Sequence, residues 1–247
     1  MSVYRQSPFA NLTPVVKNLL IINIIFFLAY WLIDHLSPTG PVTQLFGEFY
    51  FDALRFRPWQ FITYMFMHGG FEHILFNMFA LFSFGPILEY SIGPKKFLNF
   101  YFICGIGAGV LQMFVQAIEV HNIVGTFTIP LADKQLLSQQ LFPSSLNISQ
   151  EAAAQLYGVY QAPLVGASGA IFGILVAFGM LYPNMELMML FIPFPIKAKY
   201  LVSFYVLLEI YLGFKQSTGD SVAHFAHIGG AIFGFLLIKA WNLRRIQ

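Results

Sequence analysis

The stretch Pro163–Tyr182 reads PLVGASGAIFGILVAFGMLY and contains no charged residue. A helix needs roughly 20 mainly apolar residues to cross the hydrocarbon core of a bilayer, and this run is long enough. Small residues recur in it at Gly169, Gly173 and Ala177, one helical turn apart. Such a stripe lets a second helix approach closely inside a membrane. The stretch therefore predicts a membrane span that packs closely against another span.

The composition of the whole chain is typical of a membrane protein. Hydrophobic residues make up 57% of the 247 residues and charged residues only 10%, and the mean hydropathy is +0.68. A soluble domain carries about 25% charged residues, which cover its surface. The aromatic share of 18% excludes a disordered chain, and a net charge of +2 is too small to indicate nucleic-acid binding.

Six apolar runs are candidates for membrane spans. They are Val15–Leu36, Phe71–Ile92, Phe97–His121, Pro163–Tyr182, Tyr200–Phe214 and Val222–Trp241. We therefore expect an all-α polytopic membrane protein with a six-helix membrane domain over residues 15–241. No small-x-small cleavage site follows the first run, so we expect that run to be a retained span and not a signal peptide.

The distribution of Lys and Arg predicts how the six spans are oriented. Nine of these residues fall on the side that carries both termini, and four fall on the other side. Because cytoplasmic loops are enriched in Lys and Arg, the segments 1–14 and 242–247 are predicted to be cytoplasmic. Two long loops, about 34–70 and 122–162, then lie on the outer side. The first is apolar enough to lie in the membrane interface.

Polar side chains inside membrane spans are costly and therefore mark candidate functional sites. Ser168 directly precedes Gly169, the first member of the stripe in the fourth span. The sixth span has its own stripe, at Ala226, Gly230 and Gly234, and His227 directly follows its first member. If the stripes face each other, Ser168 and His227 meet near the outer ends of their helices. A Ser–His hydrogen bond there predicts a nucleophile with its general base; taken singly, each residue could equally be part of the helix packing.

A second pair of polar residues predicts a site for an oxyanion. His73 and Asn77 are four residues apart in the second span and share one face of its helix. Both can donate a hydrogen bond to a developing negative charge. The backbone N–H of Ser168, near the start of its helix, is a third candidate donor. The alternative for His73 and Asn77 is hydrogen bonding between helices.

The remaining polar groups are expected to be structural. His224 lies one turn before His227, and such a pair could bind a metal, but no cysteine or carboxylate lies nearby in the sequence to complete a site. We therefore expect no metal and no cofactor. Glu209 is expected to extend towards the membrane surface, which leaves no acid to orient His227. Glu89 is expected to cap or anchor a neighbouring segment.

Three segments together resemble the rhomboid family of intramembrane serine proteases. They are His73–Asn77, Gly166–Gly169, and Ala226–Gly230 with the following Gly234, within a similarity that covers about Trp59–Trp241. The resemblance implies a six-span bundle, a Ser168–His227 catalytic dyad, and an oxyanion hole made by His73, Asn77 and the Ser168 amide. Three positions depart from the family pattern: Gln60 replaces a frequent Arg, Tyr64 a frequent His, and Phe172 the Tyr that packs under the catalytic His.

The resemblance also implies how such a protein works. Its site opens to the outer side through a water-filled cavity, and the fifth span, here with Phe204, Leu207 and Leu208, gates the lateral access of substrates. The substrates would be transmembrane proteins in the lipid bilayer, and the location would be a bacterial cell membrane. Two alternatives stay open: a non-catalytic rhomboid-like protein that binds membrane clients, and a small transporter or metal protein that uses His73, His224 and His227.

Overall fold

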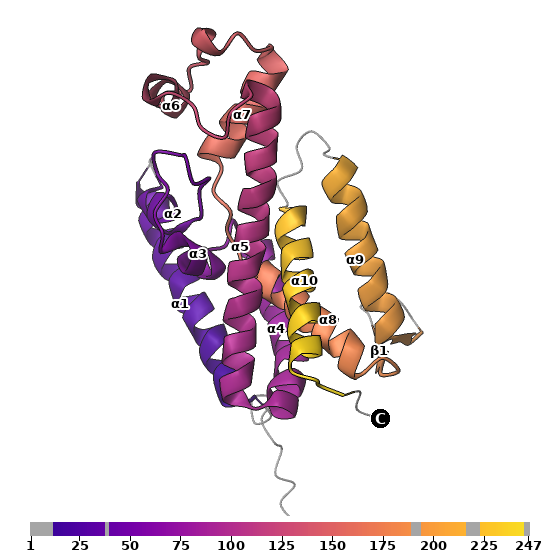
Figure 1. Ribbon diagram of the computed structural model, residues 1–247. Coiled ribbons are helices and arrows are strands. Elements are labelled where there is room, and N and C mark those ends of the chain that lie inside the picture. The colour runs from indigo at the N-terminus through magenta and orange to yellow at the C-terminus, as the bar shows by residue number, and fades with distance from the viewer. Residues whose placement is uncertain (1–11, 38–39, 189–193, 216–222, 245–247) are drawn as a thin grey trace, which may run out of the picture.

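A computed structural model describes residues 12–37, 40–188, 194–215 and 223–244 of the chain, and helices make up most of them. The elements are α1 (Pro14–Leu36), α2 (Pro41–Phe46), α3 (Gln60–Thr63), η2 (Tyr64–Phe66), α4 (Phe71–Ile92), α5 (Pro94–Val124), α6 (Leu131–Ser138), η3 (Ser144–Leu146), α7 (Gln150–Gln161), α8 (Ser168–Leu181), β1 (Glu186–Leu187), β2 (Ile196–Lys197), α9 (Ala198–Lys215) and α10 (His224–Ala240). Figure 1 shows α6 and α7 beside the upper end of α5, and α9 at the edge of the bundle. The predicted terminal segments lie largely outside the described residues, as does Val222.

The helices confirm an integral membrane domain. Among the described residues, three helices are long and apolar enough to cross a membrane, namely α1, α4 and α5, and α8 and α10 are shorter apolar helices. The second run, Phe71–Ile92, matches α4 at both ends, and α9 and α10 lie within two residues of their predicted bounds. The six-span count and the orientation of the termini stay predictions.

The fourth predicted span is helical over less of its length than the apolar run. The run begins at Pro163, whereas α8 begins at Ser168, in agreement with the expectation that Ser168 lies near the start of its helix. Leu164 instead pairs with Glu48 of the first loop through two backbone hydrogen bonds, of 2.7 and 3.0 Å. Gly166 then takes a φ of +126°, which a residue with a side chain rarely adopts. This extended segment brings Ser168 to the first position of its helix.

The two small-residue stripes face each other, as predicted. A Cβ atom added to Gly230 of α10 would lie 1.8 Å from the carbonyl oxygen of Gly169 in α8. One turn further, a Cβ on Gly234 would lie 2.7 Å from the Cα of Gly173. Because neither pair carries a side chain, the two backbones are in direct contact. The third side of this core is α5, where Ala108 lies against Gly229.

A second hydrophobic core lies beside the upper end of α5. We call this region the cap and define it as residues 49–57 of the first loop together with residues 120–161. Its buried apolar residues are Phe49, Tyr50, Ala53, Val120, Ile129, Leu137, Leu156, Val159 and Tyr160. The second long loop, 122–162, is therefore a folded unit with α6, η3 and α7. Ser149 caps α7 by accepting a hydrogen bond from the Ala152 N–H at 3.2 Å.

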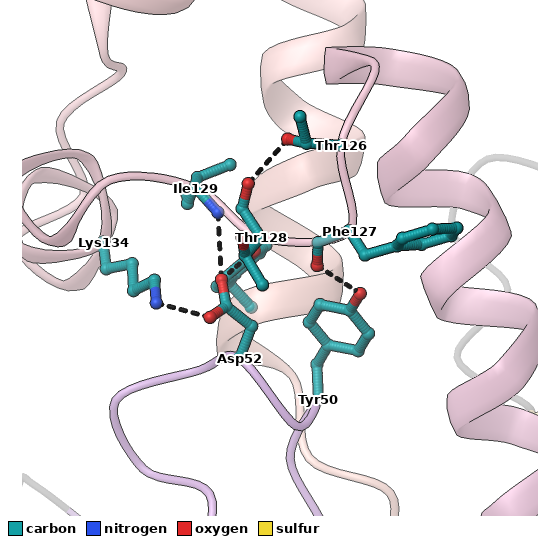
Figure 2. A network of polar contacts seen from close by, with 8 residues as sticks. Tyr50, Asp52, Thr126, Phe127, Thr128, Ile129 and Lys134 are labelled. Atoms are coloured by element: carbon teal, nitrogen blue, oxygen red, sulfur yellow. Dashed lines mark hydrogen bonds and ion pairs between the residues drawn. The ribbon is translucent and has the colours of Figure 1, made fainter.

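Asp52 is the polar centre of the cap (Figure 2). Its carboxylate accepts hydrogen bonds from the Ile129 N–H at 3.0 Å and from the Tyr160 hydroxyl at 2.8 Å, and it pairs with Lys134 Nζ at 2.5 Å. Beside it, the Tyr50 hydroxyl donates to the Phe127 carbonyl at 2.8 Å. These bonds join the first loop to the second across more than 70 positions of sequence.

Two buried polar side chains hold the segments on which the site depends. Gln60, which replaces the frequent Arg, is fully buried and organises the first loop by accepting from the Arg57 N–H at 2.9 Å and donating to the Arg55 carbonyl at 3.0 Å. Glu89 caps the first turn of α1, as expected, by accepting from the N–H groups of Val15 and Val16.

Candidate active site

Ser168 and His227 are in hydrogen-bond contact at the upper ends of α8 and α10. His227 Nε2 lies 2.8 Å from Ser168 Oγ, and both residues are partly exposed. The contact follows from the packing of the two stripes, because a longer residue at Gly230 would separate the two helices. A hydroxyl in contact with an imidazole nitrogen is the arrangement in which the imidazole can take the hydroxyl proton.

The ring of His227 is held in plane by Phe172, one turn below Ser168. The two rings are stacked with centroids 4.4 Å apart and an interplanar angle of 10°. Phe172 occupies the place of the Tyr that the family pattern contains. Stacking on a flat ring limits the rotation of the imidazole and needs no hydroxyl group, so this departure leaves the position of His227 defined.

His73 lies on the other side of the nucleophile, across Gly166. A Cβ added to Gly166 would lie 2.7 Å from His73 Nε2 and 3.5 Å from Ser168 Oγ, so both side chains flank this glycine. His73 Nδ1 accepts a hydrogen bond from the Gly69 N–H at 3.3 Å. An imidazole whose Nδ1 accepts carries its proton on Nε2. The His73 N–H is therefore directed to the space beside Ser168.

The other two predicted oxyanion donors are in different situations. The Ser168 amide is the first of α8, so its N–H has no acceptor inside the helix. Asn77 is buried, and its side-chain nitrogen donates to the His73 carbonyl at 2.9 Å. An amide nitrogen carries two N–H bonds, so one remains for another acceptor. Asn77 also joins the backbone of His73 to the next turn of α4.

A buried histidine supports His73 from outside the helices. His68 is 1% exposed, and its ring lies edge-on to that of His73 with centroids 5.2 Å apart. Neither of its nitrogens has a hydrogen-bond partner among the residues that the structure describes. Burial, together with the nearby His73, lowers the pKa of His68 to about 3, so its ring is neutral at physiological pH.

Glu209 is the site residue that the sequence analysis did not identify. It was expected to extend towards the membrane surface, but it is 9% exposed and points into the bundle. Its Oε2 lies 2.6 Å from His224 Nδ1 and 2.9 Å from His227 Nδ1. The prediction that no acid is available to orient His227 was therefore wrong. The sequence signal for Glu209 is that it is an acid inside an apolar run, where a charged group needs a buried partner.

The same three residues could hold a metal ion. Glu209, His224 and His227 each offer one donor atom, and these atoms lie within 4.8 Å of one another. The structure thus supplies the carboxylate that His224 and His227 lack in the sequence. The contacts of 2.6 and 2.9 Å are, however, distances typical of a hydrogen bond and an ion pair between the carboxylate and the two rings.

The three predicted gate residues lie on α9, away from the Ser168–His227 contact. Phe204 is 61% exposed and Leu207 is 65% exposed, so both face outwards from the bundle. Leu208, beside Glu209, is partly buried. Their role as a gate stays a prediction.

A family model and individual relatives point to the same protein family. The sequence model of the Rhomboid domain matches residues 55–132 and 135–242. Rhomboid protease AarA of Providencia stuartii is 30% identical over 188 residues, which cover 75% of this chain and 56% of the relative. An uncharacterised mitochondrial rhomboid protein of Schizosaccharomyces pombe is 27% identical over 220 residues, which cover 79% of this chain and 55% of that protein. The chain thus spans about half the length of these relatives.

Proposed function

Because the chain belongs to the rhomboid family, we propose that it is an intramembrane serine endopeptidase with Ser168 as nucleophile and His227 as general base. The observation that carries the proposal is the 2.8 Å contact between Ser168 Oγ and His227 Nε2. A serine hydroxyl is a weak nucleophile until an adjacent base removes its proton. The contact supports the proposal because His227 Nε2 lies within hydrogen-bond distance of the Oγ whose proton it would take.

The reaction would be acyl transfer to Ser168. The Oγ proton moves to His227 Nε2 while Oγ bonds to the carbonyl carbon of the scissile peptide. The carbonyl oxygen becomes an oxyanion, which the Nε2–H of His73 and the Ser168 amide would stabilise, with the second N–H of Asn77. His227 then gives its proton to the leaving amine nitrogen as the C–N bond breaks. Water, activated by the same histidine, hydrolyses the acyl-enzyme.

The proposed substrates are transmembrane segments that unwind near the membrane surface. A continuous helix keeps its carbonyl groups bonded within the segment, and the backbone in lipid stays bonded in this way. An unwound turn frees a carbonyl for attack at the upper ends of α8 and α10. We propose six spans with both termini cytoplasmic, and a site that opens to the outer side. The proposed location is a bacterial cell membrane, although relatives in mitochondria are also similar.

The test is cleavage of a single-span model substrate by the full chain in detergent and in liposomes. Ser168→Ala and His227→Ala should each lower the rate by about 10³-fold or more. Ser203→Ala and His121→Ala, at exposed positions, are the matched controls and should cleave as the wild type does. EDTA should have no effect. Undiminished cleavage by Ser168→Ala would rule out the proposal, and substrate binding without cleavage by the wild type would favour a client-binding protein.

A further inference from the structure

Helix α9 buries very little of itself, and its one buried charge is Glu209. The buried residues of the helix are Ala198, Glu209 and Gly213. Its large side chains face outwards: Tyr200, Phe204, Leu207, Tyr211 and Phe214 are 61–77% exposed. A carboxylate buried in an apolar bundle is strongly destabilising unless it is paired. Since few residues of α9 face inwards, the inward position of Glu209 indicates that its carboxylate interacts with specific groups in the bundle.

The atoms that Glu209 contacts indicate what its carboxylate does. Glu209 Oε2 lies 2.9 Å from His227 Nδ1, which is the ring nitrogen opposite the one that contacts Ser168. A negative charge at Nδ1 stabilises the tautomer that carries its proton there and leaves the Nε2 lone pair to accept a proton. It also stabilises the cation that forms when Nε2 becomes protonated.

We infer that Glu209 is a positioning residue that holds His227 in its base-competent tautomer and stabilises the imidazolium. The inference rests on the proposed function of Ser168 and His227. The proton of Ser168 Oγ moves to His227 Nε2 and later to the leaving amine. Throughout, the Nδ1 proton stays on the ring and Glu209 stays ionised. The carboxylate thus acts on the reaction only through His227.

Two features of α9 and α10 keep the carboxylate in place. Gly213 lets α9 approach α10, since a Cβ there would lie 3.3 Å from the Cβ of His224. His224 Nδ1 lies 2.6 Å from the same Oε2 that contacts His227. Although His227 Nδ1 lies 2.9 Å from the same oxygen, it forms no well-aligned hydrogen bond with it. Glu209 therefore acts on the neutral His227 ring through its charge and not through a well-aligned hydrogen bond, and the well-formed hydrogen bond belongs to His224.

The test is a pair of substitutions at position 209 in the full chain, measured with the model substrate. Glu209→Gln keeps the shape but removes the charge, and should lower kcat by about 10²-fold or more while KM changes little. Glu209→Asp keeps the charge and should recover part of the lost kcat. Glu186→Gln makes the same change at an exposed position before α9 and should match the wild type. A purely structural role would give equal losses for Asp and Gln.

A second measurement separates the chemistry from substrate access. A fluorophosphonate probe reacts with a serine that is activated by its base, so Glu209→Gln should slow labelling of Ser168 by the same factor as kcat. Thermal unfolding in detergent tells whether each variant is folded; if Glu209→Gln is not, the rate of Glu209→Asp against the wild type carries the test.

Wild-type rates in Glu209→Gln, with Ser168→Ala inactive, would overturn the inference but keep the proposed function. Loss of wild-type activity in EDTA would also overturn it, because the cluster would then hold a metal. Full activity of Ser168→Ala would instead reject the proposed function.

Discussion

The α8–α10 interface and the cap hold their parts in place in opposite ways. At the interface, Gly230 lies against Gly169 and Gly234 against Gly173, so the fit depends on side chains that are absent. In the cap, Asp52 gathers three donors, and the fit depends on side chains that are present. Inside an apolar bundle, direct backbone contact can hold two helices together without burying polar side chains, which is unfavourable there. Beyond the bundle, polar bonds can join loops that are distant in sequence.

A short seam lies between the two regions: Glu48, which precedes the cap residues of the first loop, pairs with Leu164, which precedes α8. Leu164 belongs to the segment that ends at Ser168, and Gly166 in the same segment donates its N–H to the Tyr64 carbonyl at 2.9 Å. The position of the nucleophile therefore depends on α10, which fixes one side of α8, and on the first loop, which fixes the chain that leads into α8.

The same substitution made in both regions should have opposite effects, and this is the largest difference that we expect. Gly230→Ala places a methyl group 1.8 Å from a backbone oxygen, so α8 and α10 must separate. We expect about 3 kcal/mol of destabilisation and a loss of activity of about 10²-fold or more, because the Ser168–His227 contact lengthens. Thermal unfolding and cleavage of the model substrate measure both.

The control is Gly158→Ala in α7 of the cap, where no atom lies within 4 Å of the added methyl group. Alanine is favoured over glycine inside a helix by about 1 kcal/mol, so this variant should be slightly more stable and fully active. Equal effects of the two alanines would show that the glycines of α8 and α10 do not determine how closely these helices approach.

The seam should make stability depend on pH. Glu48 is 3% exposed, and burial raises the pKa of its carboxyl from 4.5 to about 8. The folded chain therefore binds a proton that the unfolded chain releases between these two values, and stability should fall as pH rises from about 5 to 8. The expected loss is on the order of a few kcal/mol, measured as thermal midpoints across this range.

Glu48→Gln carries no charge at any pH and should remove this part of the dependence. Above pH 8 the variant should be more stable than the wild type, and near pH 5 the two should be similar. A wild-type midpoint that rises between pH 5 and 8 would contradict the neutral Glu48. It would instead indicate a cation beside the carboxylate, because an ionised partner lowers the pKa of an acid.

Asp52→Asn should loosen the cap and leave the α8–α10 interface intact. The amide keeps one acceptor oxygen but loses the charge, and in either orientation its NH₂ group faces a donor, which is Lys134 at one position and Ile129 with Tyr160 at the other. We expect about 1–3 kcal/mol of local destabilisation, seen as faster proteolysis within residues 122–162. Cleavage of the substrate should fall less than for Gly230→Ala. An equal loss of activity would show that the cap directly determines the geometry at Ser168.

The sequence predicts the interface better than the cap, for a physical reason. A stripe of small residues is a local pattern, so the four-residue spacing of Gly169 and Gly230 with their neighbours predicts two helices that each pack closely against another helix. The contacts of Asp52 with Ile129 and Lys134 join positions more than 70 residues apart, and no local pattern pairs them. Local patterns and the resemblance to a family predicted roles for Ser168, His227 and His73, but neither predicted how the loop 122–162 folds.

Distant contacts decide two features that local patterns do not. The apolar run begins at Pro163 but its helix begins at Ser168, because the backbone of Leu164 is bonded to Glu48. Glu209 was expected to reach towards the surface, because the sequence does not tell which side of α9 faces α10. That rotation is set by Gly213 against His224, and it brings the carboxylate to the two histidines.

The smallest effect that we expect comes from a substitution that removes an ion pair of the cap but keeps its hydrogen bonds. Lys134→Met removes the ion pair with Asp52 but keeps the donors from Ile129 and Tyr160. The two charged side chains are 16% and 10% exposed, so the pair is only partly shielded and should contribute about 1 kcal/mol or less. Added salt should reduce the difference between the variant and the wild type in rates of proteolysis. A loss as large as that of Asp52→Asn would mean that the ion pair, more than the hydrogen bonds, holds the cap together.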